Sequence, residues 1–197
     1  MIFRCFLVFI LSLFVSTSHA FTSVKRDFNE LVAMADIVLV GNVSQIRPQW
    51  QDPVAKDFIE SIIILDSLEV MKGDVSSATY EIKIAGGELP PYSVQIPGAP
   101  TFKLNQRYVF FIKDNMQAVF PFVGVHDGLF KVHQLSDGNT VVKTMSGNIV
   151  SRVVNDEVVT TKQNSKSLTT EMMTFESFQR LIKSRVDQGA TSESVVP

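Results

Sequence analysis

The sequence predicts a mainly β (α+β) protein: an antiparallel barrel or sandwich of short strands, flanked by an amino-terminal and a carboxy-terminal helix. Runs rich in Val, Ile, Thr, Phe and Tyr recur along most of the 197 residues, and Gly, Asn, Asp and Pro separate them. About eight to ten such runs can be counted, and most connections are as short as hairpin turns. Helical spacing of apolar residues occurs near the two ends of the chain instead. Many short strands with tight turns are typical of a closed or nearly closed barrel, or of a sandwich.

Residues 1–20 have the three parts of a signal peptide: a positively charged start, the apolar core Cys5–Val15, and small residues at Ser18 and Ala20. A membrane-spanning helix needs about 20 apolar residues, and this run is shorter. We therefore expect residues 1–20 to be removed and the mature chain to begin at Phe21. The mature protein is then exported, to the periplasm or the extracellular medium, and keeps no stable membrane anchor.

The composition of this mature chain excludes several classes of function. The one cysteine, Cys5, lies in the leader, so the mature chain has no disulfide, no thiolate nucleophile and no cysteine-ligated metal. Without Arg4, 17 basic residues face 20 acidic ones, a net charge of −3 with His neutral. There is no run of Lys and Arg, so neither a nucleic acid nor an anionic membrane surface is expected as the principal partner.

An amino-terminal helix is predicted to begin near Thr22 or Ser23, either of which could cap it, and to end near Asp36. Its apolar face would consist of Val24, Phe28, Leu31, Val32 and Ala35, which follow at helical spacing.

Two long β runs follow. The first is Ile37–Ile46, in which Gly41 marks a bulge or a close backbone approach. The loop Arg47–Pro53 leads towards the second run, Phe58–Lys72, in which three consecutive isoleucines argue against a helix. Asp66-Ser67 marks a bend in this long strand.

The middle of the chain contains an alternating strand around residues 79–84, a Gly-Gly break, and a Pro-rich crossing loop, Leu89–Ala99. Tyr108–Ile112 is apolar on both faces, so we expect it to be a central strand. Five turn signals, at residues 113–115, 124–128, 136–139, 146–148 and 155–157, then separate the short runs that precede the polar linker Lys162–Thr170.

Thr174 is predicted to cap a closing helix whose apolar face is Phe175, Phe178, Leu181, Ile182 and Val186. Residues 21–188 thus form a single β-rich domain, and residues 189–197 a frayed tail.

Several segments, in this order, resemble one family of proteins. They are "MADIVLVGNVSQI", "LEVMKGD", "IKIAGGE", "IPGAPTFKLNQRYVFFI", "FPFVGVHDGLFKV" and "TFESFQRLI". The family comprises exported bacterial domains with an "ADxVVxGxV…VLKG…PGG…PGxPxFxxGExYVLFL" layout, which occur alone or near matrixin-type metalloproteases and surface-sorting systems. Asn105-Gln106 replaces the family's Gly-Glu, and Ala85 replaces its proline before Gly-Gly. The resemblance implies an OB-like, netrin-like barrel without enzymatic activity.

Catalytic chemistry has few candidates. His126 with Asp127 could enter a Ser-His-Asp triad, but no G-x-S-x-G elbow is present, and adjacent turn residues do not present both side chains to one nucleophile. We interpret "HDG" as a turn, with Gly128 at positive φ and Asp127 bonded to its own backbone. His126 and His133 would point to opposite faces of a strand, so no metal site is expected. Asp66 and Glu69 could act as paired carboxylates only by a chance placement in a cleft.

Binding has better candidates. Trp50, in its Pro-flanked loop, could form with Tyr92 an aromatic platform for a sugar or a peptide, or it could instead plug one end of the barrel. The crossing loop adds Leu89, Val94 and Gln95 to the predicted binding residues.

We therefore expect a non-enzymatic exported module that binds a secreted or surface protein, or another surface component, through barrel loops, without a cofactor or metal. The alternatives are a small exported hydrolase with an unrecognised site and a sugar- or peptide-binding barrel. Netrin-like inhibitors of metalloproteases chelate zinc through an amino-terminal cysteine, which is missing here. Inhibition of a metalloprotease by insertion of a loop, such as residues 89–100, is a further alternative.

Overall fold

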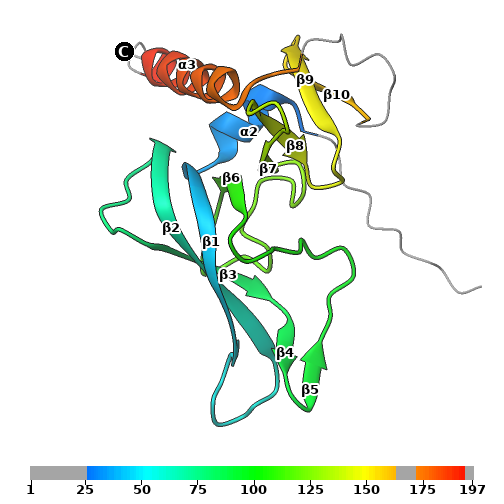
Figure 1. Ribbon diagram of the computed structural model, residues 1–197. Coiled ribbons are helices and arrows are strands. Elements are labelled where there is room, and N and C mark those ends of the chain that lie inside the picture. The colour runs from blue at the N-terminus through cyan, green and yellow to red at the C-terminus, as the bar shows by residue number, and fades with distance from the viewer. Residues whose placement is uncertain (1–25, 163–171, 194–197) are drawn as a thin grey trace, which may run out of the picture.

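The computed structural model describes residues 26–162 and 172–193 (Figure 1). The expected leader, most of the expected linker and the last four residues of the expected tail lie outside this part of the chain. The described residues contain two helices, α2 (Phe28–Met34) and α3 (Phe175–Glu193). They also contain ten strands: β1 (Ile37–Trp50), β2 (Ile59–Lys72), β3 (Tyr80–Ala85), β4 (Gly87–Leu89), β5 (Tyr92–Val94), β6 (Arg107–Ile112), β7 (Leu129–Gln134), β8 (Thr140–Thr144), β9 (Ile149–Val154) and β10 (Glu157–Thr161).

Eight of these strands form one antiparallel sheet, in the order β10-β9-β8-β7-β6-β1-β2-β3, while β4 and β5 form a separate hairpin. The prediction of a mainly β protein with a helix near each end is confirmed. The sheet is not closed into a barrel, however, because β3 and β10 are its two edges and do not pair with each other. Nor do the eight strands divide into the two facing sheets of a sandwich.

The open edge at β3 has a local cause. The backbone N–H of Lys83 donates to Asn115 Oδ1 (3.3 Å), and that of Ala85 donates to the carbonyl of Val119 (3.0 Å). Asn115 Nδ2 in turn donates to the carbonyl of Glu81 (2.8 Å). The loop after β6 thus occupies the backbone groups that a closing strand would need, and it also protects the edge from pairing with another chain.

The hairpin of β1 and β2 extends beyond the rest of the sheet. Its pairing register shifts between Val40 and Asn42, around Gly41, and a Cβ on Gly41 would lie 3.1 Å from Leu65 and Leu68. The predicted bulge is therefore present, opposite the predicted bend at Ser67, whose φ is +50°. Because β1 pairs with β6 only over Ile37–Asn42, its second half continues with β2 alone, towards the far end of the molecule (Figure 1). The prediction of a loop from Arg47 is wrong, since these residues pair with β2 and β1 ends only at Trp50.

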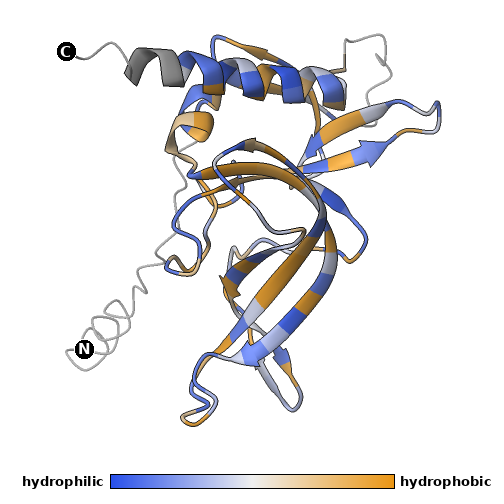
Figure 2. Ribbon diagram, turned by 90° about the vertical axis from the view of Figure 1, so that its left-hand side faces the viewer, coloured by the Kyte–Doolittle hydropathy of each residue, from blue (hydrophilic) through white to orange (hydrophobic). Residues whose placement is uncertain are grey.

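Two apolar cores lie on opposite faces of the sheet. One packs α2 and α3 against β1, β6, β7, β8 and β9, and the other fills the concave side between β1, β2, β3 and β6. Figure 2 shows apolar residues along the curved strands and the two helices together at one end of the sheet. Strand β6 contributes Val109 and Phe111 to the helical side and Tyr108, Phe110 and Ile112 to the concave side. It is the central strand that its sequence predicts.

The first helix begins later than predicted. Its N-cap is Asp27, whose carboxylate accepts from the Glu30 backbone N–H (2.7 Å), while Glu30 Oε2 accepts from the Asp27 N–H (3.2 Å). This is a capping box, so Thr22 and Ser23, which lie outside the described residues, do not cap α2. The buried face keeps the predicted Phe28, Leu31 and Val32.

Helix α3 begins as predicted, because Thr174 Oγ1 accepts from the Ser177 N–H (3.2 Å). Phe175, Phe178 and Ile182 are buried, and Leu181 and Val186 pack partly against the same core. The helix runs past Gly189 to Glu193, since an exposed glycine lowers helix stability by only about 1 kcal/mol.

Candidate functional site

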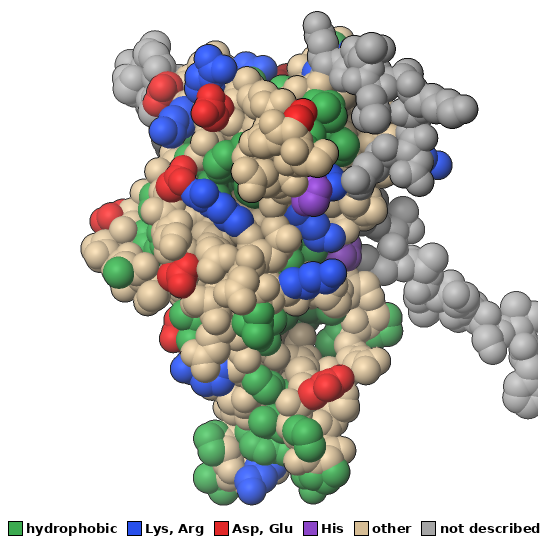
Figure 3. All heavy atoms as spheres, viewed as in Figure 1, with side chains coloured by type: hydrophobic (Ala, Val, Ile, Leu, Met, Phe, Trp, Pro, Cys, Tyr) green, Lys and Arg blue, Asp and Glu red, His purple; other side chains and the backbone are tan. Residues whose placement is uncertain are grey.

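An apolar surface lies at the end of the molecule opposite the helices, where the β1–β2 loop and the β4–β5 hairpin meet. We call it the apolar tip, and it comprises Trp50, Pro53, Val54, Leu89, Pro90, Pro91 and Tyr92. Figure 3 shows hydrophobic side chains gathered over this end of the molecule. Val54 is 92 % exposed and Tyr92 is 60 % exposed, so these large apolar groups are available for contact.

The β1–β2 loop holds its shape through Asp52. The Asp52 carboxylate accepts from the backbone N–H groups of Val54 (2.7 Å) and Ala55 (3.0 Å), and its carbonyl accepts from that of Lys56 (2.9 Å). The hydrogen bonds from Ala55 and Val54 lower the pKa of Asp52. Each of these contacts stays within the loop, and together they present Val54 outward.

The β4–β5 hairpin pairs Leu89 with Tyr92 across a two-proline turn. Its base is fixed to β2, because Ser61 Oγ donates to the Gly86 carbonyl (2.7 Å) and the Gly86 N–H donates to the Ile59 carbonyl (2.9 Å). Gly87 is so close to β1 and β2 that an added Cβ would lie 2.5 Å from Ser61 Oγ. This close packing holds the hairpin beside the end of β1.

The structure brings together Trp50 and Tyr92, the two aromatic residues predicted as a platform. Their ring centroids are 5.3 Å apart and their planes are inclined at 68°, an edge-to-face arrangement. Trp50 is half-buried and belongs to neither apolar core, so it does not plug the concave side of the sheet.

Replacing Trp50 with alanine should therefore affect stability only slightly. We expect a loss of about 0.5–1.5 kcal/mol, the contribution of an aromatic pair, instead of the 3–5 kcal/mol of a core tryptophan. Equilibrium urea unfolding of Trp50→Ala, followed by far-ultraviolet circular dichroism, measures this difference. A loss above about 3 kcal/mol would place Trp50 in the core.

The other predicted binding residues lie close by. Val94 and Gln95 line a cleft of about 480 Å³ between the crossing loop and the sheet. Its walls are largely apolar, with Ile63, Ile84 and Phe102, and Ser61 and Glu88 add polar atoms. The five predicted residues thus divide between two adjoining features, with Trp50, Leu89 and Tyr92 on the tip and the other two in the cleft.

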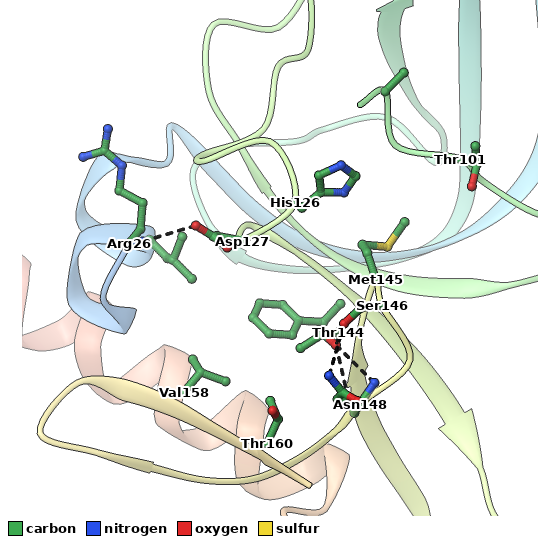
Figure 4. Close-up of a pocket in the computed structure, with 13 residues that line it drawn as sticks. Arg26, Thr101, His126, Asp127, Thr144, Met145, Ser146, Asn148, Val158 and Thr160 are labelled. Atoms are coloured by element: carbon green, nitrogen blue, oxygen red, sulfur yellow. Dashed lines mark hydrogen bonds between the residues drawn. The ribbon is translucent and has the colours of Figure 1, made fainter. Parts of the chain in front are cut away.

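Sequence reasoning missed a second cleft, of about 510 Å³, near the helices (Figure 4). His126, Asp127, Thr144, Ser146 and Asn148 line it, together with residues from four further segments of the chain. No local pattern could identify this cleft, since its lining is assembled from helix, strand and turn residues far apart in the sequence. Figure 4 shows that its hydroxyl and amide groups bond to one another, with Thr144 Oγ1 2.9 Å from Ser146 Oγ.

The histidines form no catalytic pair in the part of the chain that the structure describes. His126 Nε2 lies 3.0 Å from the Gly98 carbonyl, so the ring links its turn to the crossing loop. Asp127 Oδ2 accepts from the Arg26 backbone N–H (3.2 Å) instead of capping its own turn. Positive φ occurs at Gly124 and Val125 and not at Gly128, which packs so tightly that a Cβ would lie 2.6 Å from the Val123 carbonyl.

The candidate acids Asp66 and Glu69 have structural partners. Asp66 accepts from Asn42 Nδ2 (3.2 Å), and Glu69 forms an ion pair with Arg107 and accepts from Gln179 Nε2 (2.6 Å). Burial raises the pKa of Glu69, but the hydrogen bonds from Gln179 and Arg107 outweigh it and hold this pKa below its usual value. Glu69 thereby connects β2, β6 and α3.

This network predicts a pH dependence. Because the folded protein lowers the pKa of Glu69, its contribution to stability is present above the ordinary value of 4.5 and is lost as the pH falls through the lower folded value. Glu69→Gln should lose about 1 kcal/mol at neutral pH, as for a partly exposed ion pair. Below pH ~4 the difference from wild type should shrink. A constant difference between the two urea-unfolding curves from pH 7 to pH 3 would contradict this role.

Within residues 26–162 and 172–193, no three His, Asp, Glu or Cys side chains are placed to hold a metal ion. None of the described helices is long and apolar enough to cross a membrane. Comparison with protein-family models, with curated proteins and with solved structures found no match to this chain.

Proposed function

We propose that this chain is a non-enzymatic exported module that binds a protein or another surface component through the loops at one end of its curved sheet. The observation that carries the proposal is the apolar tip. Two loops about forty residues apart place Trp50 against Tyr92 and leave Val54 almost fully exposed. Exposed apolar side chains that gather on one surface mark interaction sites more often than isolated ones do. Loops fixed by a rigid scaffold are common binding places.

Two further features support an OB-like, netrin-like origin for the module. Strand β1 pairs with both β2 and β6, as the first strand of a partly open five-stranded Greek-key barrel does. The resemblance of residues 31–132 to exported bacterial domains adds the expectation of an OB-like, netrin-like barrel without enzymatic activity.

A sugar- or peptide-binding barrel is the second candidate, and the cleft beside Val94 and Gln95 favours it. A volume of about 480 Å³ is within the usual range for small-ligand sites. Apolar walls with a few polar groups, here Ser61, Glu88 and Gln95, are also typical of such sites. No observation favours the hydrolase alternative.

Affinity capture with matched variants tests the first proposal. The purified protein is immobilised and exposed to cell-envelope and culture-supernatant fractions, and the retained components are quantified. Trp50→Ala combined with Tyr92→Ser should reduce retention about tenfold, because it removes two aromatic contacts. Val154→Asp changes an exposed valine on β9 and serves as the control, which should retain as much as wild type.

Equal retention by wild type and the double variant, with both proteins folded by circular dichroism, would contradict the proposal. Loss of retention in the control as well would trace the binding to a different surface.

A further inference from the structure

We infer that the apolar tip docks into the interfacial region of a lipid bilayer, and that the bilayer is one of zwitterionic phospholipid. This inference rests on the proposed function and names the surface component that the tip binds. Four observations carry it: the satisfied backbone of the loops, the position of the aromatic pair, the size of the tip and its charge.

The backbone of the tip presents few free hydrogen-bond donors. Pro53, Pro90 and Pro91 carry no N–H, and the N–H groups of Val54, Ala55 and Lys56 donate within their own loop. Turns built on an aspartate also shape loops in water. Here the pairing has a further effect, since each unpaired donor that enters an apolar medium costs several kcal/mol.

The aromatic residues lie at the base of the projecting loops. Trp50 ends β1 just before the loop that carries Val54, and Tyr92 begins β5 just after the proline turn. Tryptophan and tyrosine favour the boundary between water and hydrocarbon, because each combines an apolar ring with a polar group. The most exposed aliphatic side chain thus lies beyond two residues suited to the boundary.

The tip is small and projecting. Val54, Tyr92 and the three exposed prolines are few beside the roughly 20–30 residues that one partner contributes to a standard protein interface. Figure 3 shows the molecule narrowing towards this end. A rigid protein partner would need a matching cavity, whereas a fluid interface accommodates a projecting tip without one. The size and shape therefore favour lipid over protein.

The charge of the tip selects the kind of lipid. Asp52, Asp57 and Glu88 surround the apolar groups, with Lys56 as the one basic residue among the loop and hairpin residues 51–58 and 87–94. Anionic lipids would be repelled by this acidic excess, while zwitterionic headgroups would not. The Lys56 stem is long enough to keep its ammonium group in water.

Fluorescence provides a direct test, because Trp50 is the one tryptophan of the chain. The protein is recovered after export, and its amino terminus is sequenced to establish that the apolar leader is absent. It is then titrated with phosphatidylcholine vesicles. We expect the Trp50 emission to shift to the blue and to be quenched by brominated phosphatidylcholine.

Two variants and one change of lipid composition complete the test. Val54→Asp should weaken partitioning about tenfold, because it puts a charge where an exposed valine would enter the bilayer. Val154→Asp, with the same change on exposed β9, should partition like wild type. Added phosphatidylglycerol should weaken binding.

Absence of partitioning, equal effects of the two aspartate substitutions, or stronger binding with phosphatidylglycerol would each overturn the lipid inference. If vesicles fail to bind while capture of an envelope protein still depends on Trp50 and Tyr92, the inference is wrong and the proposed function stands. If the tip variants alter neither vesicle binding nor capture, both are wrong.

Discussion

Phe178→Ala should lower the free energy of unfolding by about 3–5 kcal/mol, the largest single effect that we expect in this protein. The Phe178 side chain is fully buried, and its ring meets those of Phe28 (5.5 Å between centroids) and Phe130 (5.0 Å). Its removal would leave a cavity where α2, α3 and the sheet meet, and rigid neighbours cannot fill it. The midpoint of thermal unfolding should fall by roughly 10 °C.

Urea unfolding of Phe178→Ala beside Glu176→Ala measures this effect, since Glu176 is exposed on the same helix. The control should change stability by less than about 0.5 kcal/mol. A loss below about 1 kcal/mol for Phe178→Ala would mean that α3 does not pack on the sheet as described.

Gly87→Ala should move the β4–β5 hairpin away from β1 and β2, with a loss of stability of about 1–3 kcal/mol. The added Cβ would lie 2.5 Å from Ser61 Oγ and 3.2 Å from Pro48 Cβ, and the buried Ser61 hydroxyl is already bonded to Gly86. The hairpin must shift to relieve this steric clash, and the shift would separate Tyr92 from Trp50. We expect the Trp50 emission to move to the red and tip-dependent binding to fall.

Gly189→Ala is the matched control, because a Cβ there meets no atom within 4 Å. It should leave stability, emission and binding unchanged or slightly raise stability. An unaltered Trp50 emission in Gly87→Ala would show that the hairpin does not depend on this close packing.

The parts of the fold that sequence reasoning predicted correctly depend on local patterns. Tyr108–Ile112 is apolar at every position and is buried on both faces. Thr174 precedes a helical apolar face and caps it, and Gly41 interrupts a β-branched run at a bulge. The cap of α2 was also visible in principle, because Asp27 and Glu30 have the spacing of a capping box. Asp27 with Glu30 therefore gives a more specific cap signal than Thr22 or Ser23.

The open edge of the sheet could not be predicted in this way. It depends on the loop after β6, in which Asp114 and Met116 adopt positive φ and Asn115 turns its amide onto β3. Aspartate and methionine do not require positive φ. The local sequence therefore does not show whether the edge of β3 is covered by this loop or paired with a strand that closes the barrel.

The candidate site was predictable in its residues but not in its arrangement. Trp50 and Tyr92, next to prolines, are recognisable from the sequence as candidate binding residues. Their contact, however, depends on the 14-residue strands of the β1–β2 hairpin and on the close fit of Gly87. Such long-range geometry is set by the whole sheet, and the sequence around either aromatic residue does not contain it.

The central claim is that the apolar tip is the surface through which this protein binds. Incorporation of fluorotryptophan places a single fluorine label at Trp50, which remains visible whatever tryptophans a partner contains. On addition of the captured component or of vesicles, the account predicts that the fluorine resonance broadens or shifts and becomes less sensitive to exchange of H₂O for D₂O. Saturated binding with an unchanged fluorine resonance would contradict the claim, because the binding surface would then lie elsewhere on the molecule.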